Sequence, residues 1–298
     1  MKLSIITINY NNAEGLRKTL ASVAAQTYHN IEHIIIDGGS TDGSVDVIKE
    51  YANKVERMNV LENEGFRVIW SSESDKGIYN AMNKGIRKAT GDYTQILNSG
   101  DLLAAPDVTE RMMAELNSLN TKRSTLNEDG IAIFYGNMLK SYDGKTIINR
   151  DTCGGNMYTP ESFLYFYKGT LNHDCAYIRR ELFEKYGLYN EQMKICSDWE
   201  WYVRAIAIGG EKAIYTNIDV TIFDMNGVSE SQGKNAELIK KERREYLESV
   251  LPASVLRDYD NFSFPVLQYQ RLKKYHLWGI VYFMERVLFR LEKWKILR

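Results

Sequence analysis

The sequence predicts an α/β fold in which a Rossmann-like, mostly parallel mixed sheet is flanked by helices and followed by a helical C-terminal extension. In the first hundred residues, short runs rich in β-branched residues alternate with segments of helical period, a pattern typical of parallel strands joined by helical crossovers. The chain has 298 residues, of which 44% are hydrophobic, so it can form one large α/β domain with elaborations or two modest domains. Residues 265–298 combine a helix-period apolar stripe with an excess of basic side chains.

The first hundred residues should contain four strands and three helices. The expected strands are Leu3–Ile8, Ile31–Ile36, Val68–Trp70 and Tyr93–Leu97, and the expected helices lie around Leu16–Val23, Val45–Ala52 and Ile78–Ala89. The third helix has the clearest pattern, because its apolar and small residues fall on one face at spacings of three and four.

The later part of the chain alternates less regularly. Its expected elements are a helix near Asp107–Leu116, a polar surface loop at Asn117–Gly130, a strand at Ile131–Tyr135, and, within His173–Ile208, a strand, a helix ending at Gly187 and a helix beginning at Ser197.

Each of the first four strands runs into a polar cluster at its carboxyl end. The clusters are Asn9-Tyr10-Asn11-Asn12, Asp37-Gly38-Gly39-Ser40, Glu73-Ser74-Asp75 and Asn98-Ser99-Gly100-Asp101. Ligands of open parallel sheets bind beyond the carboxyl ends of the strands. The sequence therefore predicts a polar ligand site along one edge of the sheet.

Charge and cysteine content narrow the class of protein. A formal net charge of −1 argues against a nucleic-acid binder. The three cysteines, Cys153, Cys175 and Cys196, show neither a disulfide framework nor zinc-ligand spacing, which favours a cytoplasmic location. We find no signal peptide and no run of roughly 18 to 20 apolar residues, so any membrane contact should be peripheral.

Two glycine-rich phosphate-binding signatures are absent: G-x-G-x-x-G after the first strand and G-x-x-x-x-G-K-[ST] anywhere. A dehydrogenase is therefore disfavoured, and a nucleotidyltransferase would need an N-terminal glycine-rich basic signature that is also missing. If phosphates are bound, a divalent cation held by one or two carboxylates is the expected substitute.

Five segments occur in a recognisable order: SIITINYNN, HIIIDGGSTDGS, SESDKGIYNAMNKGI, GDYTQILNSGD and ICSDWEW. Together they resemble the inverting family 2 glycosyltransferases of the GT-A fold, and the LNSGD version resembles enzymes of bacterial surface-polysaccharide assembly. The resemblance implies a GT-A domain at residues 1–230, with a nucleotide-binding half (1–101) and an acceptor-side half (131–230), and a helical extension at 231–298. It also implies transfer from a nucleotide-diphosphate sugar, with UDP the expected nucleotide, to a saccharide or lipid-linked saccharide hydroxyl.

Carried over residue by residue, the resemblance implies a donor site on the predicted edge. Its members would be Thr7, Asn9 and Tyr10 against the nucleoside, Asp37 at the base or ribose, Asp75, Gly77 and Asn80 near the ribose and sugar, and Asn98 and Asp101 at the diphosphate. A turn residue in a D-G-G-S loop is the alternative for Asp37. Where many relatives carry Arg, this chain has Met82, which leaves Lys76 and Lys84 as candidate phosphate-binding cations.

The resemblance further implies a divalent metal, Mn²⁺ or Mg²⁺, at Asp101. The usual motif offers two carboxylates, whereas N-S-G-D offers Asp101 and only the amide of Asn98. One carboxylate, two phosphate oxygens and waters can still make an octahedral site. The alternative is a turn in which Asp101 bonds nearby backbone amides.

The segment Ser197-Asp198-Trp199-Glu200 supports two compatible interpretations. As local structure, S-x-x-E is a capping box that opens a helix, with Asp198 in its first turn. By resemblance, Asp198 is the base that takes the acceptor proton, and His173 and Trp199 lie on the acceptor side; a purely structural histidine is the alternative for His173. The loop Gly227-Val228-Ser229 resembles a phosphate loop of the family, with a surface turn as the alternative.

The implied reaction is a direct displacement with inversion, in which the acceptor hydroxyl attacks the anomeric carbon as the diphosphate leaves. Asp198 would accept the proton, and a metal at Asp101 would offset charge on the diphosphate. A catalytically inactive nucleotide-sugar-binding protein is the alternative from another class.

The C-terminal segment carries an apolar stripe among basic residues, formed by Leu277, Ile280, Met284, Val287, Leu291 and Trp294. This pattern predicts a helix that lies on an anionic membrane surface, on its own domain or on a second subunit.

Overall fold

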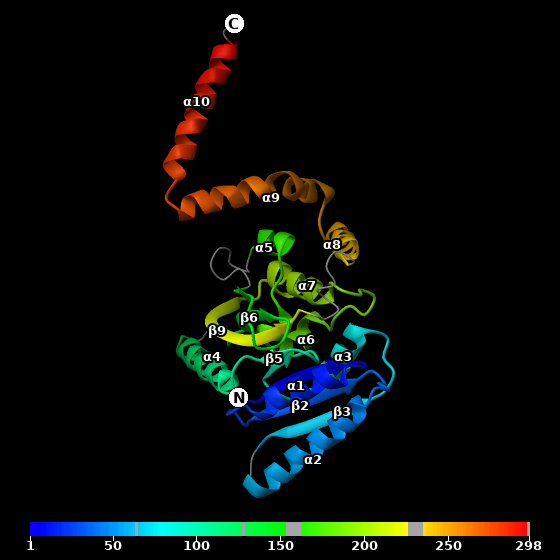
Figure 1. Ribbon diagram of the computed structural model, residues 1–298. Helices are drawn as coiled ribbons and strands as arrows, with labels where there is room; N and C mark the ends of the chain where they lie inside the picture. The colour runs from blue at the N-terminus through cyan, green and yellow to red at the C-terminus, as the bar shows by residue number, and fades with distance from the viewer. Residues whose placement is uncertain (63–64, 127–128, 153–161, 226–234, 297–298) are drawn as a thin grey trace. The chain divides into compact units, whose positions relative to one another are not determined.

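The computed structural model describes residues 1–62, 65–126, 129–152, 162–225 and 235–296. The chain divides into two compact units, Met1–Arg244 and Glu245–Arg298. The boundary expected at residue 230 lies outside the described residues, and the predicted domain limits stay a prediction. The first unit is a mixed α/β structure with a curled, mostly parallel sheet flanked by helices, which confirms the predicted fold class (Figure 1).

All seven elements expected in the first hundred residues are present. The strands are β1 (Leu3–Asn9), β2 (Ile31–Asp37), β3 (Arg67–Ser72) and β4 (Tyr93–Ile96), and the helices are α1 (Ala13–Ala24), α2 (Ser44–Glu62) and α3 (Ile78–Lys88). The four strands are parallel, with β1 between β2 and β4. Every residue of β1 and β2 is buried, as expected for strands covered on both faces.

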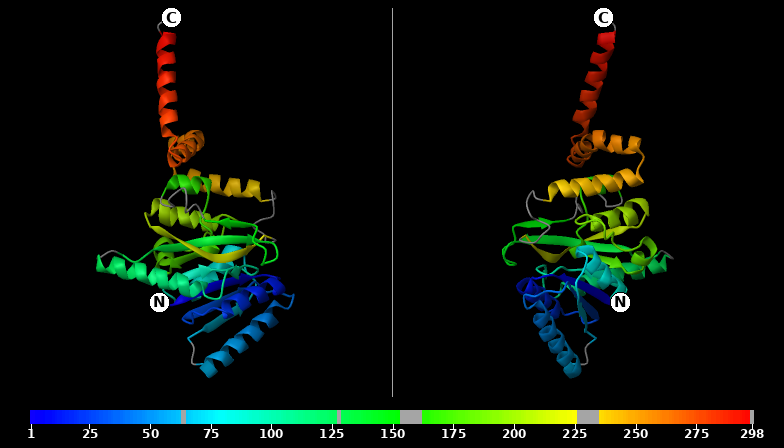
Figure 2. Two further views of the ribbon diagram at one scale, coloured as in Figure 1. Left: turned by 60° about the vertical axis from the view of Figure 1, so that its left-hand side comes forward. Right: turned by 90° about the vertical axis from the view of Figure 1, so that its right-hand side faces the viewer.

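The direction of the crossovers places the helices on opposite faces of this parallel half. The chain moves outward from β1 to β2 to β3 through α1 and α2, and α3 then brings it back to β4. Because parallel crossovers are right-handed, α1 and α2 share one face and α3 covers the other. Helix α2 lies along β3 in Figures 1 and 2, and α3 packs on β1 and β2. That contact requires Gly85, since a Cβ there would lie 2.3 Å from Cγ2 of Ile6.

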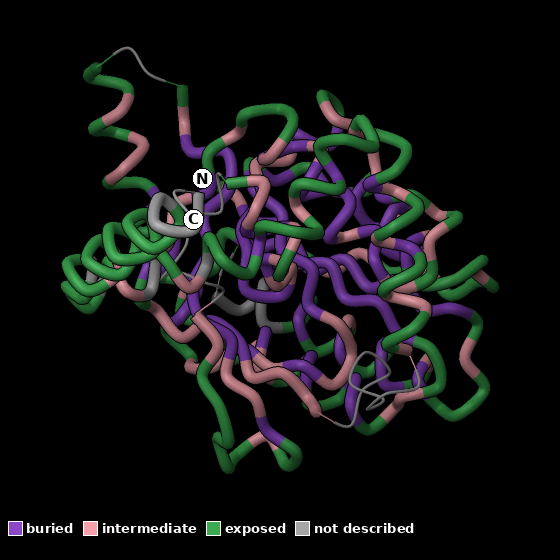
Figure 3. Tube along the Cα trace, turned by 90° about the horizontal axis from the view of Figure 1, so that it is seen from above, coloured by how far each residue is buried: buried purple, intermediate pink, exposed green. Residues whose placement is uncertain are grey.

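The second half of the first unit extends the sheet with antiparallel and parallel partners. Its elements are β5 (Leu102–Leu103), α4 (Val108–Thr125), β6 (Ile133–Ser141), β7 (Asn149–Asp151), α5 (Phe163–Lys168), the 3₁₀ turn η1 (His173–Cys175), β8 (Ala176–Arg179), α6 (Glu181–Tyr186), α7 (Ser197–Tyr202), the π-helical segment η2 (Val203–Ile208) and β9 (Ala213–Asp224). The described strands form a nine-stranded sheet of order β3-β2-β1-β4-β8-β6-β9-β5, with β7 on β6. The central strands β1, β2 and β4 are buried throughout, and Figure 3 shows the buried residues concentrated in the interior of the trace.

The loop predicted at Asn117–Gly130 is wrong over its first part, because α4 continues to Thr125. Tertiary contacts extend the helix beyond what its polar sequence indicates. The Asn120 amide donates to the Tyr93 hydroxyl at 3.2 Å, and its carbonyl accepts from the Ile131 amide at 2.7 Å. Asn120, held by Tyr93 on β4, thus occupies an inward position of the helix where the helical pattern would require an apolar residue.

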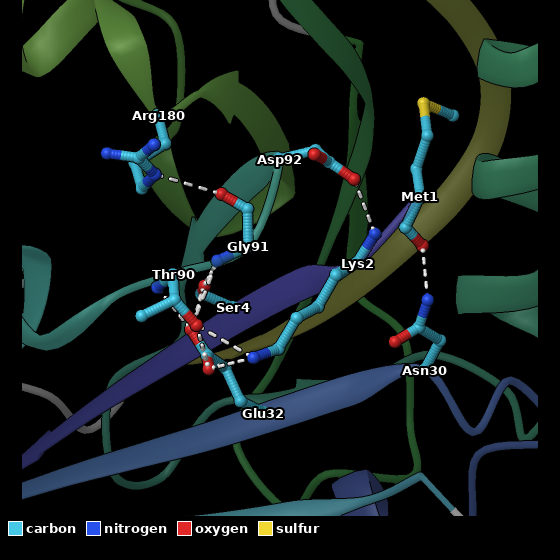
Figure 4. A network of polar contacts seen from close by, with 9 residues as sticks. All are labelled: Met1, Lys2, Ser4, Asn30, Glu32, Thr90, Gly91, Asp92 and Arg180. Atoms are coloured by element: carbon cyan, nitrogen blue, oxygen red, sulfur yellow. Dashed lines mark hydrogen bonds and ion pairs between the residues drawn. The ribbon is translucent and has the colours of Figure 1, made fainter.

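The amino ends of β1 and β2 are joined by a carboxylate buried among donors (Figure 4). Glu32 forms an ion pair with Lys2 and accepts from the Ser4 hydroxyl at 2.6 Å, the Thr90 hydroxyl at 2.7 Å and the Gly91 amide at 3.2 Å. Burial would raise the pKa of Glu32, but these hydrogen bonds lower it to about 2. This network fixes the end of the sheet opposite to the predicted ligand edge.

Helix α8 (Ala236–Val250) begins in the first unit, and the second unit contains α9 (Ala253–Lys274) and α10 (Trp278–Ile296). The predicted stripe is exposed on α10: Ile280, Met284 and Leu291 have 56–58% of their surface accessible, and Figure 3 shows this helix in the colour of exposed residues. The side chains of Trp278 and Trp294 lie outside the described residues. Among the described helices, none is long and apolar enough to cross a membrane.

Candidate active site

The carboxyl ends of β1, β2 and β3 are tied together by Asp37. Its carboxylate accepts from the Asn9 amide at 2.8 Å, from the Ser40 hydroxyl at 2.6 Å and amide at 2.9 Å, and from the Ser72 hydroxyl at 2.6 Å. Burial would raise the pKa of Asp37, but these hydrogen bonds lower it. Asp37 is completely buried, and its carboxylate organises the loop. Its expected contact with the base or ribose stays a prediction.

The side chain of Thr7 lies in the sheet core and not at the predicted donor edge. It is fully buried, and its hydroxyl lies 2.9 Å from Nε2 of His33, whose Nδ1 lies 2.9 Å from the Tyr51 hydroxyl. The structure gives the Thr7 side chain a partner in the sheet core, and its expected nucleoside contact stays a prediction. The period-two pattern of a strand buried on both faces does not tell which face a side chain joins.

Tyr10, Gly38 and Asp75 lie together beyond the strand ends. The ring of Tyr10 is 66% exposed. A Cβ on Gly38 would lie 2.8 Å from Oδ2 of Asp75 and 3.1 Å from Cδ2 of Tyr10, so the missing side chain is what lets the carboxylate and the ring approach. Asp75 also accepts from the Gly77 amide at 3.1 Å, and Gly77 has the φ of +123° that glycine adopts readily. The sequence interpretation missed Gly38, whose only signal is the doubled glycine of the D-G-G-S loop.

Asn80 is partly buried and links α3 to the segment before α7. Its carbonyl accepts from the Lys76 amide at 3.2 Å, and its amide donates to Glu191 at 2.7 Å. The candidate cation Lys84 pairs with Glu73 at 3.0 Å. These contacts within the protein account for the positions of Asn80 and Lys84 without a bound sugar donor.

Asp198 lies at the centre of a polar cluster drawn from four elements. Its Oδ2 lies 3.1 Å from Nδ1 of His173, and its Oδ1 lies 3.0 Å from the Tyr79 hydroxyl. On the far side of the imidazole, Nε2 of His173 lies 3.1 Å from the side-chain amide of Asn98. The side chain of Asp198 keeps 15% of its surface accessible and that of His173 keeps 20%. The structure thus brings together three predicted site residues from α7, η1 and the end of β4.

The charges of this cluster are set by the contact between Asp198 and His173. Burial would lower the pKa of His173, but its hydrogen bond to Asp198 and the charges of Asp198, Asp174 and Asp101 raise it to about 9. Burial would likewise raise the pKa of Asp198, but the hydrogen bond and charge of His173 and the Tyr79 hydroxyl lower it. At neutral pH the cluster therefore holds an ionised carboxylate against an imidazolium.

Asp101 is almost completely buried beside two further carboxyl groups. Its Oδ1 accepts from the Asp224 amide at 2.9 Å, and neighbouring Asp174 accepts from the Thr221 hydroxyl at 2.9 Å. Burial and the charges of Asp174 and Asp224 raise the pKa of Asp101 well above its usual range. Next to it, the side-chain amide of Asn98 lies 3.1 Å from Nε2 of His173, and the protonated Nε2 of an imidazolium requires the amide oxygen as its acceptor. A bound cation would relieve the repulsion between the buried carboxyl groups around Asp101.

A preformed metal site is nevertheless not found. Within the described part of the chain, no three His, Cys, Asp or Glu side chains are arranged to hold a metal ion. Asp101 and Asn98 thus fit a cation that completes its coordination with ligand and water oxygens, and they do not fit an all-protein cage.

The capping-box interpretation of Ser197 is wrong. Helix α7 begins at Ser197 with Cys196 as its N-cap and without a side-chain cap, because the Ser197 hydroxyl accepts from the Asn190 amide at 2.5 Å. Asp198 does lie in the first turn. Trp199 is 1% exposed, and its indole donates to the Phe166 carbonyl at 2.7 Å, so it packs in the core. Its expected place on the acceptor side stays a prediction. The loop Gly227-Val228-Ser229 lies outside the described residues.

The chain is similar to a known protein family and to several of its members. The model of glycosyl transferase family 2 matches residues 4–187. An uncharacterized glycosyltransferase of Mycobacterium tuberculosis is 32% identical over 209 residues, which cover 69% of this chain and 69% of the relative. A PGL/p-HBAD biosynthesis glycosyltransferase of Mycobacterium bovis is 27% identical over 240 residues, or 80% of this chain and 82% of the relative.

Solved structures share the fold at low identity. S. aureus TarS in complex with UDP-GlcNAc aligns with a TM-score of 0.61 at 15% identity, covering 92% of this chain and 73% of that chain. The mannosyltransferase PcManGT from Pyrobaculum calidifontis, in complex with GDP-Man and Mn²⁺, aligns with a TM-score of 0.57 at 16% identity, covering 96% of this chain and 80% of that chain. The match of the family model over more than half of the chain, together with these relatives, shows that the chain is a GT-A glycosyltransferase that belongs to glycosyl transferase family 2.

Proposed function

We propose that this glycosyltransferase moves a sugar from a nucleotide-diphosphate sugar, a UDP-sugar, to an acceptor hydroxyl with inversion, in the assembly of a cell-surface polysaccharide. The observation that carries the proposal is Asp198: an ionised, partly accessible carboxylate held between His173 and Tyr79 beside Asn98. Two structural relatives were solved with UDP-GlcNAc and with GDP-Man, which supports a nucleotide-sugar donor.

In the proposed step the acceptor oxygen bonds to the anomeric carbon while the bond from that carbon to the diphosphate oxygen breaks. The diphosphate leaves with the electron pair, and the hydroxyl proton passes to Asp198. The His173 imidazolium holds the other carboxylate oxygen at 3.1 Å and keeps the carboxylate oriented. One base is sufficient, because inversion needs no covalent intermediate with the protein.

Asp101 and Asn98 are the residues that would hold a divalent cation, Mn²⁺ or Mg²⁺. When bound there, the cation would offset the negative charge that develops on the leaving diphosphate. Support comes from the raised pKa of Asp101, which lies buried beside Asp174 and Asp224, and from the relative solved with Mn²⁺.

The nucleoside would lie against Tyr10, Gly38 and Asp75. The exposed ring of Tyr10 offers a stacking face for the base. The Asp75 carboxylate, next to the bare backbone of Gly38, can accept from a uracil N–H or a ribose hydroxyl. Asn9, which in this structure donates to Asp37, supports the loop that carries Gly38.

The exposed face of α10 supports attachment to the cytoplasmic face of an anionic membrane. Five of its large apolar side chains, Ile280, Phe283, Met284, Leu288 and Leu291, are at least 56% exposed, and Arg286 and Arg290 lie on the same helix. Apolar insertion and attraction of the basic residues to anionic headgroups would act together, and a lipid-linked acceptor would then be within reach. Docking of this helix on a second subunit, which would make the protein a homo-oligomer, is the competing outcome.

The test is a donor screen with product analysis. UDP-, GDP- and dTDP-sugars are each supplied with Mn²⁺ and an acceptor saccharide, and the anomeric configuration of the product is read by NMR. We expect turnover with UDP-sugars and a product of inverted configuration. A retained configuration would contradict the mechanism, and binding without turnover for every donor would favour the non-catalytic alternative.

A further inference from the structure

Glu242, on α8, accepts hydrogen bonds from three successive backbone amides. Its Oε1 accepts from Lys194 N at 2.7 Å, and its Oε2 accepts from Ile195 N at 3.1 Å and Cys196 N at 3.0 Å. The Glu242 residue is 8% exposed. These amides directly precede α7, the helix that carries Asp198 in its first turn.

The segment held by Glu242 touches the base cluster. The Ile195 carbonyl lies 2.5 Å from the Tyr79 hydroxyl, which lies 3.0 Å from Oδ1 of Asp198. The single hydroxyl proton of Tyr79 can go to either oxygen. A shift of the 194–196 backbone would therefore move the partner of Asp198 as well as the start of its helix.

The neighbouring residues of α8 reinforce the contact. The guanidinium of Arg243 lies 5.0 Å from the ring centroid of Trp199, the residue after Asp198. The Cys196 thiol lies 3.8 Å from the Ile239 carbonyl. The first turns of α8 thus contact both sides of Asp198 along the chain, and all these residues belong to the first compact unit.

We infer that Glu242 is a positioning residue for the proposed base: it fixes the backbone from which Asp198 and its partner Tyr79 are presented. The amides before a helix lack partners within it, and one buried carboxylate that accepts from three of them defines their positions. Displacement of a catalytic group by about 1 Å is enough to cost about 100-fold in rate. The inference rests on the proposed function, because Glu242 can affect the reaction in this way only if Asp198 is the base.

Glu242→Gln tests it, because a carboxamide of equal size keeps one acceptor oxygen and turns an NH₂ group toward the remaining amides. Glu237→Gln, an exposed residue on the same helix, is the matched control. For each protein we would measure UDP affinity and stoichiometry with Mn²⁺ by calorimetry, and kcat per binding-competent site at about pH 7.5.

We expect Glu242→Gln to keep full stoichiometry and UDP affinity within about twofold, with kcat reduced about 10- to 100-fold. The loss should appear in kcat and not in UDP affinity, because a displaced Asp198 affects proton transfer to the base and not the donor contacts. Glu237→Gln should match the wild type. A variant that binds UDP with reduced stoichiometry is replaced by Glu242→Asp, which keeps the charge with a shorter reach and should show an intermediate kcat.

Two outcomes would overturn the inference: unchanged kcat in the Gln or Asp variant at full UDP stoichiometry, or a kcat that Glu242→Gln lowers by the same factor in the wild-type and Asp198→Asn backgrounds, which is the behaviour of a merely structural residue. Asp198→Asn separates the inference from the proposed function. If Asp198→Asn keeps wild-type turnover, the base assignment fails; if it is inactive while Glu242→Gln is normal, only the positioning role fails. In the Asp198→Asn background, Glu242→Gln should not reduce the residual turnover further.

Discussion

His33 is a buried imidazole at the join of β1, β2 and α2, and it should make the stability of this protein sensitive to mild acid. It is inaccessible to solvent, between the hydroxyls of Thr7 and Tyr51 at 2.9 Å each. Burial lowers its pKa to about 3, against about 6.5 in an unfolded chain. Because the folded form binds its proton less readily, the stabilisation is complete above pH 6.5 and is lost progressively as the pH falls toward 3.

The magnitude follows from the shift. At pH 7.5 both states are almost fully deprotonated at His33, whereas at pH 5.0 the unfolded chain is about 1.5 pH units below its pKa and the folded protein is still neutral. At about 1.36 kcal/mol per unit, His33 removes about 2 kcal/mol of unfolding free energy between these two pH values. Glu32, whose pKa is lowered to about 2, acts mainly below pH 4.5 and contributes little in this window. His173, whose pKa is raised to about 9, acts in the opposite direction, because its stabilisation grows as the pH falls toward about 6.5. The effect of His33 is therefore read from the difference between a variant and the wild type.

The assay is urea unfolding at pH 7.5 and pH 5.0 for the wild type, His33→Gln and the control His29→Gln. The glutamine amide can bond both hydroxyls but cannot titrate, so His33→Gln should show about 2 kcal/mol less loss of stability between the two pH values than the wild type. His29 is exposed, and its variant should follow the wild type. An equal loss in His33→Gln and wild type would refute the argument from burial.

Three further perturbations test the site and the tail. Asp101→Asn should weaken UDP binding in Mn²⁺ at least about tenfold, because the carboxylate proposed to hold the cation is gone; unchanged affinity in calorimetry would remove that role. Gly38→Ala places a Cβ 2.8 Å from Asp75 Oδ2 and should weaken UDP binding about tenfold, whereas wild-type affinity would separate this loop from the donor. Phe283→Ser with Leu288→Ser on exposed α10 should reduce co-sedimentation with phosphatidylserine vesicles, and undiminished binding would exclude the apolar face as the anchor.

Much of the fold could be predicted because it depends on local pattern. Buried parallel strands are near-continuous apolar runs, so β1 and β2 were located to within one residue at each end. The extension of α4 past Asn117 could not be predicted, because it depends on Asn120 meeting Tyr93 on a distant strand.

The site was predictable in outline and not in orientation. The motifs placed Asp198, His173, Asn98 and Asp101 in one region, and the structure brings them together. Which way a side chain faces depends on tertiary partners: Thr7 turns to His33, and Trp199 turns to Phe166. Glu242 gives no sequence signal at all, because its amide partners lie 46 to 48 residues away along the chain.

The central claim is that the carboxylate beside His173 and Tyr79 takes the acceptor proton. The most direct measurement compares Asp198→Asn with the wild type for both sugar transfer and UDP affinity. We expect transfer to fall at least about 1,000-fold while UDP affinity in Mn²⁺ stays within about twofold. Transfer within a few-fold of the wild type, or loss of UDP binding that parallels the loss of transfer, would contradict it.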